Sequence, residues 1–429
     1  MNTHTFIKKV FSNGLTVILI PRKESPTSTV LVLVEAGSKY ETKKINGISH
    51  FLEHMCFKGT KRRPRSSDIS GELDALGAQY NAFTGHEYTG YYAKVDPGHI
   101  GRALDIVADI YQNQIFRDAE IKRESGVIVE EINMYEDNPQ RKIHDNLTAL
   151  LYGNQPAGWN IAGTKKTVRG ITKKHLKAYR AKHYVASATT VIVAGSFNEK
   201  NMLADIRKHF SGIRNTRKHK KEKVVERQKK PELSLEHKKT DQSHMIIGIR
   251  TFPHADPRAY ALEVLATALG GGMSSRLFEL VREKLGAAYY IYASNDLYTD
   301  HGYLMIGTGV GNGRAKEVLS AILKECTQLK NVPMTDKELS KVKDYLVGKL
   351  YLGLETTDQL AWFYGQGHVL EKKIETPEMW VKKLRAVTAD DVQHLARELF
   401  QNKNLNFVSI GPERNKEEFS RILHLAGEV

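Results

Sequence analysis

The stretch GISHFLEHMC, residues 47–56, combines a regular apolar pattern with three polar side chains. Its apolar residues recur at positions i, i+3, i+4, i+7 and i+8, which is the pattern of an α-helix with one buried face. They are Ile48, Phe51, Leu52, Met55 and Cys56. At 3.6 residues per turn, His50, Glu53 and His54 fall on the opposite face. The pattern therefore predicts a short amphipathic helix that presents these three polar side chains together.

The three polar residues form an H-x-x-E-H sequence, the inverse of the H-E-x-x-H zinc motif. Residues i and i+4 lie one above the other on a helix, so the imidazoles of His50 and His54 can bind one metal ion. Glu53 then stands within reach of a water on that ion. A catalytic zinc has three protein ligands and one open position, so a third ligand has to come from elsewhere. The alternative, three polar residues on a solvated helix face, stays open on the motif alone, because the chain contains 17 histidines.

Length and composition indicate an ordinary globular protein of more than one domain. The chain has 429 residues, of which 41% are hydrophobic and 26% charged. Its two cysteines, Cys56 and Cys326, are too few for a disulfide framework and suit a reducing compartment, so we expect a cytoplasmic protein. No apolar run approaches the roughly 18 residues of a membrane span, and the N-terminus lacks a signal-peptide pattern. We therefore expect no contact with a membrane.

Much of the formal net charge of +15 is concentrated in one stretch near the middle of the chain. Residues 214–230 contain nine Lys and Arg against Glu222 and Glu226. A charge block without interleaved aromatic residues is more often a solvated linker than a nucleic-acid site, so we expect no nucleic-acid partner. We predict a domain over residues 1–213, a basic linker over 214–235 and a second domain over 236–429.

The two halves of the chain resemble each other in three places, which indicates an internal duplication. Residues 171–176 and 387–392 each place a threonine where it would cap a helix, and each predicted helix leads to an apolar strand closed by glycine, at 190–195 and 406–411. Residues 118–132 likewise match 336–350. A hairpin is predicted around Asn13-Gly14. The predicted fold is α+β, with two homologous α/β-sandwich halves in which helices pack on a sheet.

Downstream of the motif, the chain closely resembles the pitrilysin family of inverted-motif zinc peptidases, in its bacterial and mitochondrial processing peptidase β-like branch. The resemblance rests on residues 47–55, 57–60, 81–84 and 161–164. In that family the third zinc ligand is a glutamate 77 positions after the second histidine, which implies Glu131 here. A supporting glutamate seven residues earlier corresponds to Glu124. The adjacent Glu130 would point about 100° away on a helix and is the poorer candidate.

The same resemblance implies residues that bind substrate. Asn81 and Ala82 correspond to an exposed edge strand that pairs with an extended peptide, although an ordinary strand is the alternative. Arg282 and Tyr289 correspond to a substrate-binding pair in the second half, where Ala287 replaces the usual leucine. The second half lacks the motif, and Lys349 aligns with Glu131. We therefore expect one Zn2+ per chain.

These inferences predict a zinc metalloendopeptidase that hydrolyses peptides or unfolded protein segments. Glu53 would act as general base, and Tyr289 would hydrogen-bond the developing oxyanion. The resemblance further implies that the halves close like a clam shell around a chamber, and that the chain forms a homodimer or pairs with a related subunit. The rival hypotheses are a non-catalytic scaffold subunit and a nucleic-acid-binding protein whose affinity depends steeply on salt.

Overall fold

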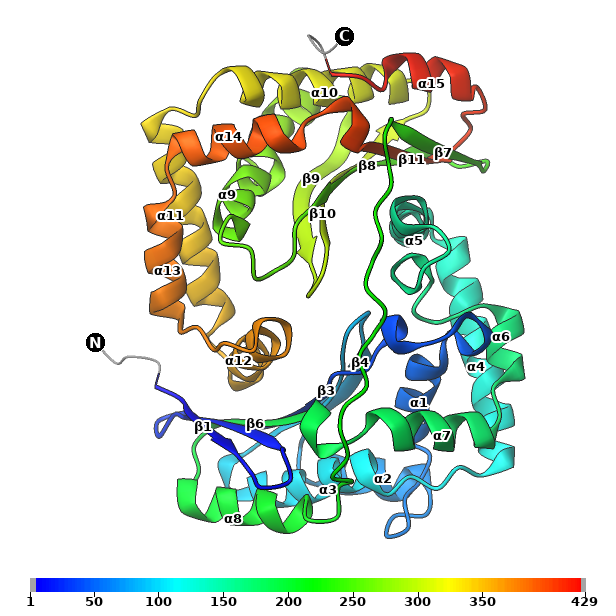
Figure 1. Cartoon of the computed structure of the whole chain (residues 1–429), viewed down its shortest axis with the longest axis vertical. Coiled ribbons are helices and arrows are strands. Elements are labelled where there is room, and N and C mark those ends of the chain that lie inside the picture. Colours follow the sequence, from blue (N-terminus) through cyan, green and yellow to red (C-terminus); the bar gives the residue numbers. More distant parts are fainter. Residues whose placement is uncertain (1–4, 426–429) are drawn as a thin grey trace. The chain divides into compact units, whose positions relative to one another are not determined.

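The computed structural model describes residues 5–425 and divides into two compact units (Figure 1). The first unit contains Met1–Asn133, Trp159–Glu222 and Tyr351–Glu378. The second contains Met134–Gly158, Lys223–Leu350 and Met379–Val429. Each unit is built around one β-sheet, as the duplication in the sequence predicts.

The sheet of the first unit has the strand order β1-β2-β6-β3-β5-β4. Its strands are β1 (Ile7–Val10), β2 (Thr16–Pro21), β3 (Ser28–Val34), β4 (Gln79–Thr84), β5 (Thr89–Val95) and β6 (Thr189–Gly195). β1 and β2 form the hairpin predicted around Asn13-Gly14, and β2 with β6 is the one parallel pair among the described strands of this sheet. β4 pairs with β5 and has no second neighbour within residues 5–425, so it is an edge strand.

Helices cover one face of this sheet and bury the apolar side of β3 (Figure 1). They are α1 (Ile48–Cys56), α2 (Ser66–Ala75), α3 (Ile100–Gln112), α4 (Asp118–Asp137), α6 (Lys165–Gly170), α7 (Lys173–His183) and α8 (Glu199–His209). Val30, Val32 and Val34 of β3 share one core with Phe51 and Leu52 of α1. The helix predicted from the apolar stripe of residues 48–56 is therefore confirmed, with its stripe buried.

The second unit repeats this topology without a counterpart of β1. Its strands are β7 (Glu232–His237), β8 (Gln242–Thr251), β9 (Ala288–Leu297), β10 (Gly302–Gly311) and β11 (Leu405–Gly411), in the order β7-β11-β8-β10-β9. Its helices include α9 (Ala259–Gly270), α10 (Ala315–Asn331), α11 (Asp336–Gly353), α13 (Pro377–Ala386), α14 (Ala389–Leu399) and α15 (Lys416–Ile422). Thr172 and Thr388 cap α7 and α14 as predicted. The two homologous α/β halves are confirmed.

Each unit also takes one helix from the other half of the sequence. Helix α12 (Thr357–Glu371) packs on β3 and β6 of the first unit, and α5 (Pro139–Tyr152) packs on β11 and β8 of the second. The two helices hold equivalent places in the duplicated order, so the exchange is reciprocal. The sequence did not indicate this exchange. The domain boundaries expected from the sequence, 1–213 and 236–429, stay a prediction.

The basic stretch of residues 214–230 has no helix or strand, as expected for a linker. It is not wholly solvated, because two of its lysines form ion pairs with acidic residues from earlier in the first unit. Lys218 lies 2.8 Å from Glu35, and Lys221 lies 3.2 Å from Glu87. Part of its positive charge is therefore neutralised within the fold.

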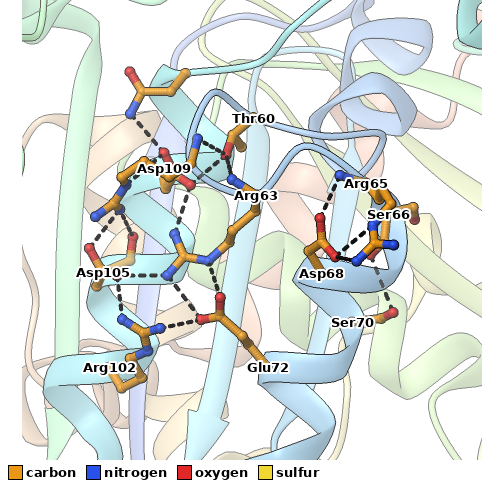
Figure 2. A network of polar contacts seen from close by, with 12 residues as sticks. Thr60, Arg63, Arg65, Ser66, Asp68, Ser70, Glu72, Arg102, Asp105 and Asp109 are labelled. Carbon is orange, nitrogen blue, oxygen red and sulfur yellow. Dashed lines mark hydrogen bonds and ion pairs between the residues drawn. The ribbon is translucent and has the colours of Figure 1, made fainter.

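A buried ion network fixes the loop that follows α1 (Figure 2). Arg63 is only 4% exposed at its side chain, and its guanidinium lies 2.7 Å from Asp105, 2.7 Å from Asp109 and 3.0 Å from Glu72. The hydroxyl of Thr60 donates to Asp109 over 2.6 Å. Because Asp105 and Asp109 belong to α3, these contacts tie the chain leaving α1 to a helix in the core.

The packing of α12 on the first sheet leads to a testable prediction. A Cβ at Gly365 would lie 2.8 Å from Cδ1 of Leu33 on β3, whereas a Cβ at Gly367 would meet nothing nearer than 4.0 Å. Gly367→Ala should raise the thermal midpoint, because alanine favours a helix by about 0.5–1 kcal/mol over glycine. Gly365→Ala should lower it, because overpacking costs about 1–3 kcal/mol. If calorimetry gives equal shifts of the thermal midpoint for Gly365→Ala and Gly367→Ala, then α12 does not pack on β3 at Gly365.

Candidate metal centre

The start of α1 is held by a carboxylate from outside the helix. Glu41 accepts hydrogen bonds from the backbone N–H groups of Gly47, over 2.7 Å, and Ser49, over 2.8 Å. The first amides of a helix have no partner inside it, so Glu41 takes the role of a capping side chain. Gly47 has a φ of +95°, and a Cβ there would lie 2.5 Å from the carbonyl oxygen of Ala162. Burial raises the pKa of Glu41 to about 7, against its hydrogen bonds with Ser49, Asn46 and Gly47.

Helices α1 and α4 bring together the three predicted ligands. Oε2 of Glu131 lies 3.6 Å from Nε2 of His50 and 3.5 Å from Nε2 of His54. All three side chains are partly buried. Donor atoms bound at 2.0–2.1 Å to a tetrahedral zinc lie roughly 3.3–3.5 Å apart, so this donor set already has nearly the spacing that such an ion requires. The site also contains Nδ1 of His50, which is buried without a hydrogen-bond partner among the described residues.

Glu124 orients one of these histidines. Its side chain is 2% exposed, and Oε2 lies 3.2 Å from Nδ1 of His54 while Oε1 lies 2.7 Å from Nζ of Lys58. A carboxylate on one imidazole nitrogen leaves the other nitrogen for a metal, which is the usual arrangement around metal-binding histidines. Burial disfavours the charge of Glu124, but hydrogen bonds from His54 and Lys58 outweigh burial and hold its pKa below the usual value. Glu130, by contrast, is exposed and accepts a hydrogen bond from Asn133 over 3.1 Å.

Glu53 lies next to the ligands and is joined to the edge strand of the sheet. The hydroxyl of Thr84, at the end of β4, donates to Oε2 of Glu53 over 2.5 Å. Burial raises the pKa of Glu53, although this hydrogen bond opposes the rise. A carboxylate with a raised pKa is suited to accept a proton and return it near neutral pH.

Asn81 and Ala82 lie on β4, opposite Tyr92 and Tyr91 of β5. Asn81 is exposed, and its side-chain oxygen accepts the backbone N–H of Ala82 over 2.9 Å. Asn81 therefore covers one backbone donor of the edge strand. A peptide that pairs with β4 at this position has to displace the Asn81 side chain.

Arg282 and Tyr289 lie in the second unit and contact each other. Arg282 is part of a π-helix over Phe278–Lys284, an element that is rare and frequent at functional sites. Its guanidinium carbon lies 5.4 Å from the ring centre of Tyr289, and the Tyr289 side chain is 76% exposed. The structure thus shows the predicted pair as one exposed cation–π contact. Its role in substrate binding stays a prediction.

Three residues of the site have no role predicted from the sequence, although Lys58 and Thr84 lie in the stretches 57–60 and 81–84 that carry the family resemblance. Glu41 lies seven positions before Ile48, the first residue of α1, outside any capping spacing, and Thr84 meets Glu53 only because β4 ends beside α1. Lys58 lies on the loop after α1, and its contact with Glu124 is visible only in the folded structure. Each depends on tertiary contacts between elements that the sequence cannot pair.

The H-x-x-E-H motif on α1, in this fold, is that of the inverted-motif class of metallopeptidases. The family model described as Insulinase (Peptidase family M16) matches residues 16–165. The model described as Peptidase M16 inactive domain matches residues 170–346. The chain belongs to this family, so the predicted family and enzyme class are confirmed. Within residues 5–425, none of the helices is long and apolar enough to cross a membrane.

Relatives of the chain span nearly its whole length. It is 36% identical over 407 residues to the uncharacterized zinc protease YmxG of Bacillus subtilis, covering 94% of this chain and 97% of that protein. An uncharacterized zinc protease of Streptomyces coelicolor is 31% identical and covers 96% of this chain and 91% of its own length. A protease from Helicobacter pylori has the same fold, with a TM-score of 0.90 at 22% identity over 96% of this chain and 100% of that one.

The two histidines differ in charge, which predicts how metal binding depends on pH. Burial and the nearby His54 lower the pKa of His50 to about 4, so His50 is neutral at pH 7. Burial also disfavours charge on His54, but hydrogen bonds to Glu124 and Glu131 outweigh it and raise the pKa of His54 to about 9. Metal-free protein therefore holds a proton on His54 that a metal has to displace.

Zinc affinity should accordingly rise by about tenfold per pH unit up to pH 9. The stability of the metal-free fold should move the other way. Because the folded pKa lies above the unfolded value of 6.5, the contribution of His54 is full below pH 6.5 and is lost as pH rises through 9. Chelator competition and thermal melts from pH 6 to 10 measure both quantities. A zinc affinity that stays flat between pH 7 and 9 contradicts the assignment.

Proposed function

We propose that the chain is a zinc endopeptidase with one Zn2+ held by His50, His54 and Glu131. The observation that carries this proposal is that Oε2 of Glu131 lies 3.5–3.6 Å from Nε2 of both histidines, with a second carboxylate, Glu53, beside this set of three donors. Nitrogen and oxygen donors in a set of three are typical of catalytic zinc, and the named relatives are zinc proteases. Such an ion, when bound, supplies a Lewis acid for the scissile carbonyl and a water of lowered pKa.

Glu53 is the general base in this proposal. Thr84 donates to one of its oxygens and so fixes the carboxylate beside the histidines. Glu53 takes the proton of the attacking water and passes it to the amine that leaves. Its raised pKa makes Glu53 a stronger base toward the attacking water, and a positioned base of this kind contributes about 10²–10⁴ in rate.

The substrate in this proposal is an extended peptide that adds to the edge of the first sheet. β4 carries both Asn81, which covers a backbone donor, and Thr84, which contacts Glu53. A substrate strand that pairs with β4 by β-augmentation therefore lies beside Glu53, the proposed general base. Arg282 and Tyr289 are proposed to bind the peptide as well. Unfolded segments fit this mode because their backbone is free to pair. Dimerisation, the cytoplasmic location and the lack of a nucleic-acid partner stay predictions.

Replacing Glu53 distinguishes the role of a general base from that of a metal ligand. Glu53→Gln should lower the turnover of a fluorogenic peptide by about 10²–10⁴ while zinc content stays at one per chain, because the amide cannot accept a proton. Glu130→Gln, a matched change on an exposed carboxylate, should leave both unchanged. Turnover of Glu53→Gln within tenfold of the wild type would rule out Glu53 as the base.

Replacing Glu131 tests the ligand set. Glu131→Gln should lose most of its bound zinc, because one of the three donors becomes a weak neutral ligand. Metal analysis after dialysis against a mild chelator measures this, with Glu130→Gln as control. If Glu131→Gln keeps full zinc and Glu130→Gln loses it, the third ligand is Glu130 and the assignment is wrong.

A further inference from the structure

Lys58 lies two residues beyond the end of α1 and contacts the carboxylate behind the metal ligands. Its Nζ is 2.7 Å from Oε1 of Glu124, and its side chain is 26% exposed. The backbone N–H of Lys58 donates to Met55 over 3.2 Å, which continues the last turn of α1. Lys58 and His54 are four positions apart on this turn, so both reach the same carboxylate of α4.

Glu124 has one partner on each oxygen. His54 occupies Oε2 and Lys58 occupies Oε1. An ionised carboxylate buried to this degree requires compensation, and loss of one partner from a buried pair is much more costly than loss of a surface ion pair. Without Lys58 the carboxylate of Glu124 has no partner on Oε1 and is free to rotate. Rotation weakens the hydrogen bond that it accepts from His54.

The hydrogen bond between Nδ1 of His54 and Glu124 sets the orientation of the His54 ring. In this orientation Nε2 of His54 faces Glu131. His50 has no equivalent support, since its Nδ1 lacks a hydrogen-bond partner within the described chain. Among the described residues, Glu124 is the carboxylate that contacts an imidazole of this pair at Nδ1. Residues that hold a ligand from behind commonly change metal affinity or activity by about 10–100-fold when replaced.

We propose that Lys58 is a positioning residue of the metal site, which holds Glu124 so that His54 presents Nε2 to the ion. This inference rests on the proposed zinc ligands. In this proposal Lys58 acts on the ion through two other side chains, Glu124 and His54. Its neighbour Lys61 offers a matched control, because it is exposed and makes no side-chain hydrogen bond or ion pair in the described part of the chain.

The test measures the zinc dissociation constant of the full chain by competition with a chromophoric chelator, and the thermal midpoint of the same proteins in excess chelator. Lys58→Met should weaken zinc binding by about 10–100-fold. Lys58→Arg should recover most of this loss, because it restores a cation beside Glu124, and Lys61→Met should bind zinc like the wild type. Lys58→Gln replaces Lys58→Met if that protein does not fold.

A double-mutant cycle then tests the route through Glu124. In the background of Glu124→Gln, Lys58→Met should weaken zinc binding by less than about twofold, because the two residues act as one unit. If the effects of Lys58→Met and Glu124→Gln on zinc binding are fully additive, the proposal is wrong. It is also wrong if Lys58→Met lowers the thermal midpoint and leaves the zinc dissociation constant unchanged. Wild-type zinc binding that depends on Glu131 but not on Lys58 refutes this inference alone. Wild-type protein without zinc affinity refutes the proposed function and this inference together.

Discussion

The two histidines share α1, a helix of nine residues, and a helix of that length is not stable alone in water. Their convergence on one point therefore depends on contacts that hold both ends of the helix. Glu41 binds the first amides, and the hydroxyl of Ser49 lies 2.7 Å from that of Tyr179 on α7. Beyond the other end, Arg63 anchors the following loop to α3. The site is thus a product of tertiary packing around a short element.

The duplicated second unit shows that the fold and the site are separable. Its α9 takes the place of α1 in the order of elements, yet α9 is apolar along nearly its whole length and its residues from Ala261 to Gly270 are almost all buried. On α11, Lys349 stands where α4 has Glu131. The same sheet and helix layer are stable without the charged cluster. The fold therefore does not require these polar residues, which are paired within the first unit by contacts such as that of Lys58 with Glu124.

Residue patterns predicted those features that depend on local spacing. The stripe from Ile48 to Cys56 predicts α1, and threonine caps predict α7 and α14. The choice of Glu131 over Glu130 came from the family resemblance and not from local spacing. The exchange of α5 and α12 was not predicted, because an amphipathic pattern shows which face of a helix is buried and not which sheet buries it. Glu41, Lys58 and Thr84 were missed for a similar reason. Each meets its partner across elements whose pairing no local spacing reveals.

In the proposed site, one metal ion is bound by two imidazole nitrogens of α1 and one carboxylate of α4. Anomalous diffraction from crystals soaked in zinc, with data collected on both sides of the zinc absorption edge, locates such an ion. We expect a single strong peak within bonding distance of Nε2 of His50, Nε2 of His54 and Oε2 of Glu131, with an open fourth position. A peak bound by other residues, or no peak beside α1, would contradict it.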